Sequence, residues 1–110
     1  MRVVPQILDA LSKIEHIFAI DGYIPVVTSA NDRNHSVGSL HYIGAAIDLR
    51  SKGLPPRVKE AIYNRLKATF KTPPWFLLWE DQSGSNEHFH LQYGLTVKDK
   101  NGKVVGYTFK

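Results

Sequence analysis

The sequence predicts an α+β domain in which two helices pack on a small, largely antiparallel sheet. Two observations predict this class. Apolar residues follow a helical period in two segments, and short strand-like runs bounded by turn residues lie between and after these segments. The length of 110 residues fits one domain, and 43% hydrophobic residues with a net charge of +4 are typical of a folded chain. We therefore expect residues 1–110 to form a single domain.

The N-terminal part of the chain predicts a helix, two strands and a long loop. Apolar residues three and four positions apart predict a helix over Val4–Ile20. The β-branched run Ile24–Thr28 predicts a buried strand, and Ala45–Leu49 predicts another. Between them, Ser29–Leu40 is polar, and a loop of that length in so small a domain is usually functional. The expected apolar stripe of the helix is Ile7, Leu8, Leu11, Ile14, Ile17 and Phe18.

The C-terminal part predicts a second helix and a set of antiparallel strands. Pro55-Pro56 begins the helix, since proline suits the first helical turn. An aromatic strand follows over Trp75–Trp79, and a polar turn over Glu80–Asn86 leads to a strand over His88–Tyr93. Asn101-Gly102 predicts a tight hairpin near the C-terminus. The expected inner stripe of the second helix is Val58, Ala61, Ile62, Leu66 and Phe70.

Composition excludes several classes of function. The chain has no cysteine, so any metal must be held by His, Asp or Glu. Its 14 Lys and Arg are dispersed along the chain, which does not favour nucleic-acid binding. No run of about eighteen apolar residues is present, so no membrane span is expected. Charged residues interrupt the N-terminal segment, so we expect no secretory signal and synthesis in the cytoplasm. We also expect a monomer.

His41 and Asp48 are the first candidates for chemistry. Seven residues of extended chain span roughly 23 Å, so both can bind one ion only if the chain turns between them, and Gly44 allows that turn. Asp48 lies in an apolar strand, where a carboxylate is costly unless it is paired or binds a metal. Strand alternation places Arg50 on the same face as Asp48. A metal site and an Asp48–Arg50 contact are both compatible with this pattern.

The segment Glu87-His88-Phe89-His90 supplies the remaining groups. One imidazole completes a His/Asp/His set with an open position, the arrangement of catalytic zinc. Glu87 could serve the same site as general base if it lies on the turn before the regular strand. Alternatively, His90 holds the metal and His88, on the same face, performs the acid–base step. Glu80 and Asp81 are expected at the turn, and either could supply the acid if Glu87 points elsewhere.

These motifs resemble those of the zinc D-alanyl-D-alanine peptidases. The resemblance covers Ile24–Tyr93 and is carried by two motifs, Ser39-x-His41-x-x-Gly44-x-Ala46-x-Asp48 and Glu87-x-x-His90. The family includes VanX- and VanY-type enzymes and phage L-alanyl-D-glutamate endolysins, and it shares its fold with the hedgehog signalling domain. The resemblance implies the hedgehog/DD-peptidase fold for this chain.

The resemblance also implies roles for individual residues. His41, Asp48 and His90 would bind Zn²⁺, with Glu87 as catalytic base and His88 as the alternative, because His88-x-His90 resembles the motif of related murein endopeptidases. Arg33 would stabilise the tetrahedral intermediate. Ser39 would help to orient the site or the substrate. His35 and Tyr42 flank the proposed site in the sequence, so we expect them in the wall of the site, where they could bind substrate.

The sequence therefore predicts a zinc metallopeptidase that cleaves a peptide bond in peptidoglycan stem peptides, either D-Ala-D-Ala or L-Ala-D-Glu. It would act on the cell wall, during phage lysis or as part of a virion. Two other hypotheses remain: a non-catalytic zinc-binding module of the same fold, and a phage structural or binding protein with a vestigial site.

Overall fold

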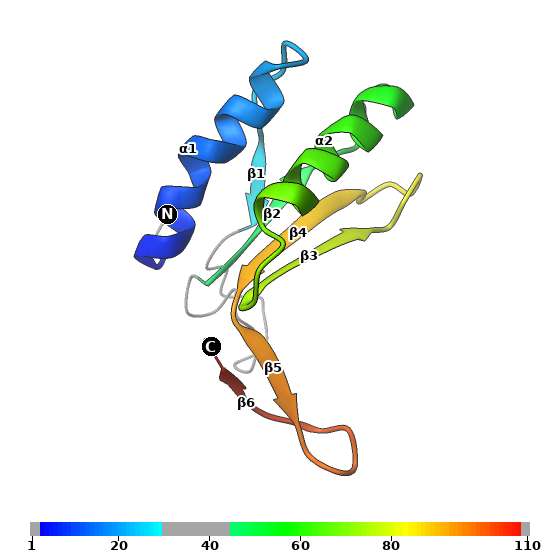
Figure 1. Cartoon of the computed structure of the whole chain (residues 1–110). Coiled ribbons are helices and arrows are strands. Elements are labelled where there is room, and N and C mark those ends of the chain that lie inside the picture. Colours follow the sequence, from blue (N-terminus) through cyan, green and yellow to red (C-terminus); the bar gives the residue numbers. More distant parts are fainter. Residues whose placement is uncertain (1–2, 30–44, 109–110) are drawn as a thin grey trace.

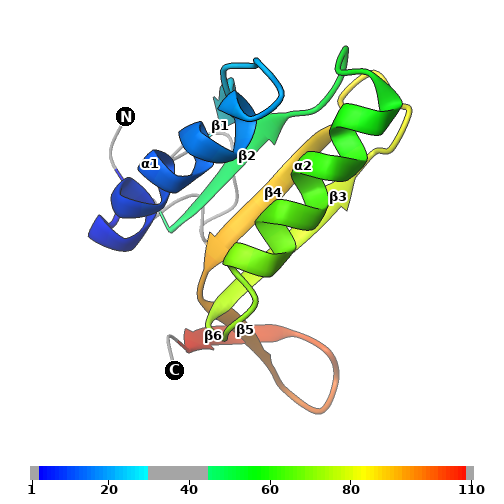
Figure 2. The same ribbon diagram turned by 45° about the horizontal axis from the view of Figure 1, so that its top comes forward.

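The computed structural model describes residues 3–29 and 45–108. In it, two helices cover one face of a four-stranded antiparallel sheet, and a separate two-stranded hairpin follows (Figures 1 and 2). This arrangement confirms the predicted α+β class. The elements, in chain order, are α1 (Pro5–Ala19), β1 (Val27–Ser29), β2 (Ala46–Arg50), α2 (Pro56–Thr69), β3 (Trp75–Glu80), β4 (His88–Tyr93), β5 (Leu95–Lys98) and β6 (Val104–Thr108).

The order of strands in the sheet is β1-β2-β4-β3, so β2 and β4 occupy its centre. Every neighbouring pair is antiparallel. Gly94 separates β4 from β5 and has φ +136°, a conformation that favours glycine. The chain leaves the four-stranded sheet at this residue, and the β5–β6 hairpin projects beyond the end of β4 (Figure 1).

The core lies between the sheet and the two helices. On β4, Phe89 and Leu91 are fully buried and face the helices, together with Ile47 and Leu49 of β2. Arg65 on α2 forms an ion pair with Asp21, which follows α1 and links the two helices. The helices contribute Ile7, Ala10, Ile14, Ile17, Phe18, Ile62, Leu66 and Phe70 to the same cluster.

Three local expectations differ from the structure. Leu8 was expected in the buried stripe of the first helix but is 62% exposed, and Ala10 is buried in its place. The strand expected at Ile24–Thr28 is the shorter β1, Val27–Ser29, and Ile24 is 85% exposed. Pro25 offers no N–H to a neighbouring strand, which fits the later start of β1. Glu80 ends β3 instead of opening the turn.

Neither of the two helices in the described part of the chain has the length and apolar content needed to cross a bilayer. Residues 30–44, which include the whole of the expected loop after Ser29, lie outside the described residues.

The packing of β4 against the helices predicts a clear difference between buried and exposed apolar residues. Replacing fully buried Leu91 with Ala should lower the free energy of unfolding by about 3 kcal/mol, because a cavity remains in the core. The matched control is Val105→Ala on β6, where the side chain is 60% exposed and the change should stay within about 0.5 kcal/mol. Urea denaturation followed by circular dichroism measures both values, and equal losses would contradict this core.

Candidate metal site on the open face of the sheet

The sheet face opposite the helices carries an ordered set of side chains from β2, β4 and β3. Strand pairing sets this order, since residues opposite each other in antiparallel strands point to the same face. Read from β2 through β4 to β3, the three rows are Ala46–Gln92–Phe76, Asp48–His90–Leu78 and Arg50–His88–Glu80. The charged and imidazole groups therefore converge toward the end of this face where β4 begins.

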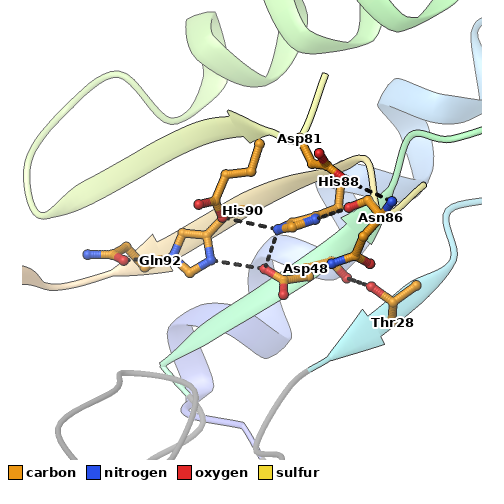
Figure 3. Close-up of polar contacts among 8 residues, drawn as sticks. Thr28, Asp48, Asp81, Asn86, His88, His90 and Gln92 are labelled. Atoms are coloured by element: carbon orange, nitrogen blue, oxygen red, sulfur yellow. Dashed lines mark hydrogen bonds and ion pairs between the residues drawn. The ribbon is translucent and has the colours of Figure 1, made fainter. Parts of the chain in front are cut away.

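Asp48 lies at the centre of the polar contacts (Figure 3). Its Oδ1 atom is 2.9 Å from Nδ1 of His90 and 3.8 Å from Nε2 of His88. Ile47 and Leu49, its neighbours in β2, are fully buried, which fixes the strand and directs the Asp48 side chain to the open face. Thr28 of β1 donates its hydroxyl to the backbone carbonyl of Asp48, at 3.4 Å. Asp48 is thus contacted from both neighbouring strands, at its backbone carbonyl from β1 and at its carboxylate from β4.

His90 contacts an acceptor on each side of its ring. Nδ1 lies against Asp48, and Nε2 lies 2.7 Å from Oε1 of Gln92. The amide of Gln92 is oriented by its own bond, because its Nε2 atom donates to the carbonyl of Gly94 at 2.7 Å. Two acceptors on one imidazole favour the doubly protonated ring. Burial lowers the pKa of His90, but the hydrogen bonds to Asp48 and Gln92 and the charge of Asp48 raise it above its usual value.

His88 is held differently, by a backbone carbonyl and a second carboxylate. Its Nδ1 atom lies 2.7 Å from the carbonyl of Asn86 and donates a hydrogen bond to it, since a carbonyl oxygen can only accept. Its Nε2 atom lies 3.0 Å from Oε1 of Glu80, its partner across β3 and β4. Burial lowers the pKa of His88, but the hydrogen bond to Asn86 and the charges of Asp48 and Glu80 raise it above the usual value.

Asp48, Glu80 and His88 sit close enough to hold a metal ion. One donor atom from each lies within 4.8 Å of the others, and the three side chains come from three neighbouring strands. Carboxylates and imidazole are ligands that zinc accepts. A ring nitrogen that donates to a backbone carbonyl, as in His88, is also the usual outer contact of a metal-binding histidine. The residues present therefore fit a divalent cation.

Glu87 is not part of this group, which corrects the expectation that it stands beside the metal as general base. It does precede the regular strand, but its carboxylate points to the helix side and is 2% exposed. Oε1 accepts from Lys59 Nζ at 2.7 Å, and Oε2 accepts from the indole nitrogen of Trp79 at 2.7 Å. Burial raises the pKa of Glu87, but these two hydrogen bonds and the Lys59 charge lower it below its usual value.

Some of the other expected site residues lie together in the structure, and others lie outside the described ranges. His88, His90 and Asp48 are brought together, and Glu80 joins them from the position where the sequence indicated only a substitute acid. The sequence signal for Glu80 was the alternation Phe76, Leu78, Glu80, which continues the exposed side of β3 to its last residue. An Asp48–Arg50 ion pair, the other interpretation of β2, is absent among the described residues. Expected residues outside the described ranges are Arg33, His35, Ser39, His41 and Tyr42.

No protein-family model matches this chain, and no curated protein or solved structure matches it either. The site must therefore be interpreted from its own residues.

The Glu87 contacts predict a stability effect with a definite pH dependence. Glu87→Gln leaves Lys59, whose side chain is 16% exposed, without its counter-charge, so unfolding should become easier by about 2–3 kcal/mol at pH 7. Because folding lowers the pKa of this carboxylate, its contribution is present above the usual value of 4.5 and is lost as the pH falls through the folded value. Thermal unfolding of both proteins between pH 3 and about pH 7 measures the difference, which should shrink in acid.

Glu60→Gln serves as the control, since Glu60 is an exposed acid on the same helix as Lys59. A Glu87→Gln protein as stable as this control would contradict the buried pair.

The two bonded nitrogens of His90 predict that metal binding is coupled to proton loss. The contacts of His90 favour its protonated form, and a cation bound to the neighbouring Asp48 would disfavour that form, as would metal binding by the ring itself. Zinc affinity should therefore rise between pH 6 and about pH 8, with release of about one proton near the lower pH. Calorimetric titration in two buffers of different ionisation enthalpy measures this number. Binding that is independent of pH in this range would exclude a protonated histidine from the site.

Proposed function

We propose that this chain is a zinc-dependent peptidase that cleaves a peptide bond in peptidoglycan stem peptides, at D-Ala-D-Ala or at L-Ala-D-Glu. One observation carries the proposal: the Asp48 carboxylate lies on an open sheet face with two imidazoles and a second carboxylate. A hydrolytic metal centre needs both ligands for the ion and a group that moves protons. The motif resemblance supplies the substrate class, with the bacterial cell wall as the place of action.

Asp48 and His90 are the ligands that we propose from the described residues. Both belong to the motif that resembles the zinc peptidases, and they are already in contact across β2 and β4. His41 would complete the set, as the same resemblance implies. When bound, zinc would polarise the scissile carbonyl and lower the pKa of a coordinated water toward about 7.

His88 and Glu80 then remain for proton transfer. The 3.0 Å contact between Nε2 of His88 and Oε1 of Glu80 forms a pair that can hold one proton between an imidazole and a carboxylate. Asn86 fixes the ring from the other side and so keeps Nε2 directed at the site. The side chain of Glu80 is 46% exposed and that of His88 is 13% exposed, so solvent reaches the pair from the Glu80 side. This pair takes the role that the sequence assigned to Glu87, in line with the alternative that His88 performs the acid–base step.

The proposed division of roles predicts different effects of four substitutions. Asp48→Ala and His90→Gln should each weaken zinc binding by more than about 100-fold, since removal of a ligand exceeds the effect of losing an outer contact. His88→Gln and Glu80→Gln should retain one zinc and lower kcat by about 10²–10⁴-fold. Zinc titration and mass spectrometry of products from purified muropeptides provide the two measurements, with release of D-Ala or of new amino termini as the expected reaction.

The outcomes separate the possible arrangements. Loss of zinc in the His88→Gln and Glu80→Gln proteins, with zinc retained in His90→Gln, would assign the ion to Asp48, Glu80 and His88 and contradict the division proposed here. One zinc with no cleavage of any muropeptide would exclude the peptidase and favour a binding module.

A further inference from the structure

A small cavity adjoins the candidate metal site at the end of the sheet where β4 begins. It has a volume of about 130 Å³ and is lined by residues from β1, from the end of β2 and from the turn before β4. His88 belongs both to this cavity and to the candidate metal site, so the two adjoin at this residue. Its lining includes Arg50, Lys52, Ser85, Asn86 and His88.

Two cations from one short segment reach this cavity. Arg50 is the last residue of β2 and lies opposite His88 in the pairing with β4, so its side chain starts on the open face beside that imidazole. Lys52 lies two residues further on, and its backbone N–H donates to the carbonyl of Glu87 at 3.3 Å. The backbone of this segment is thus tied to the start of β4.

Neither cation is neutralised within the described residues. No ion pair there involves the side chain of Arg50 or of Lys52. One acid, Glu87, also lines the cavity, but both of its carboxylate oxygens are bound to Lys59 and Trp79. The cavity therefore carries a net positive charge that its own carboxylates do not balance.

We propose that Arg50 and Lys52 form a subsite for the free carboxylate of the substrate peptide. A planar guanidinium matches the geometry of a carboxylate, and a neighbouring ammonium adds charge without a directional demand. The hydroxyl of Ser85 and the amide of Asn86 lie in the same lining and can donate to such a group. About 130 Å³ holds roughly four water molecules, which suits one acidic group and not a whole peptide.

This inference rests on the proposed function and specifies which group of the substrate the site would bind. A stem peptide that ends in D-Ala-D-Ala has a free carboxylate on the residue that leaves, and in L-Ala-D-Glu the D-Glu residue has one. Holding that carboxylate at Arg50 and Lys52 places the rest of the peptide toward the row of Asp48, His90 and Leu78.

The test uses metal-free protein, so that neither zinc nor turnover contributes to binding. The probes are acetyl-L-Lys-D-Ala-D-Ala and the same peptide with a C-terminal amide. Their binding is followed by amide chemical shifts in NMR titrations. The free acid should bind about tenfold more tightly than the amide, and the shifts should concentrate at Arg50, Lys52 and His88. In the Arg50→Gln/Lys52→Gln protein, this preference should disappear.

A charge-matched control variant is available on the other face of the sheet. Arg57→Gln/Lys67→Gln on α2 removes the same net charge and should leave the preference for the free acid unchanged. Equal binding of acid and amide by the natural protein would overturn the subsite, as would an unchanged preference in Arg50→Gln/Lys52→Gln. Inorganic phosphate that binds the same residues more tightly than the peptide would also overturn it and assign the cavity to a phosphate group.

The two proposals fail in different ways. Preference for the free acid without cleavage by the zinc-loaded protein would support the carboxylate subsite and exclude the peptidase activity. Cleavage of muropeptides with no preference for the free acid would support the peptidase activity and exclude the carboxylate subsite.

Discussion

The pairing of β2 with β4 is the constraint on which the site depends. This register places Asp48 opposite His90 and Arg50 opposite His88, while Leu49 and Phe89 between them face the core. A shift of one residue would turn every side chain of β2 to the other face, burying Asp48 and exposing Leu49. The apolar side chains of the two central strands therefore hold the polar side chains in position, so the packing of the core also determines the geometry of the site.

A second constraint acts at the start of β4, where Glu87 is buried. A buried carboxylate is tolerated only when it is paired and hydrogen-bonded, and Lys59 from α2 and Trp79 from β3 meet both conditions. The carbonyl of the same residue accepts from Ser51 and Lys52 after β2. Glu87 thus joins α2, β3 and the end of β2 immediately before His88. Its charge serves to position the strand from which the imidazoles extend.

The sequence predicted the helices, the central strands and the shared face of His88 and His90, because periodicity reports directly which residues lie together on an element. It did not predict the partners of Glu87, since Lys59 and Trp79 are distant in the chain and no local pattern links them to it. The alternation of β4 alone places Glu87 on the face of Phe89. Glu87 could lie beside the metal only if the turn before β4 directed its side chain to the opposite face. The buried ion pair with Lys59 holds the side chain on the face of Phe89 instead. The place of Glu80 in the site was not predicted, for a related reason. β3 is one residue longer than expected, so Glu80 is a cross-strand neighbour of His88 and not a turn residue.

The contacts of His90 and His88 show why two similar histidines on one strand can have different roles. Both have a raised pKa, but His90 lies between Asp48 and the oriented amide of Gln92, whereas His88 lies between a backbone carbonyl and the more exposed Glu80. A cation placed against Asp48 competes directly with the protonated ring of His90, because both interact with the same Oδ1 atom. A cation bound to Asp48 would replace the positive charge that a protonated His90 supplies to this carboxylate. His88 has a second carboxylate partner in Glu80, at 3.0 Å, so its contacts depend less on Asp48 than those of His90 do.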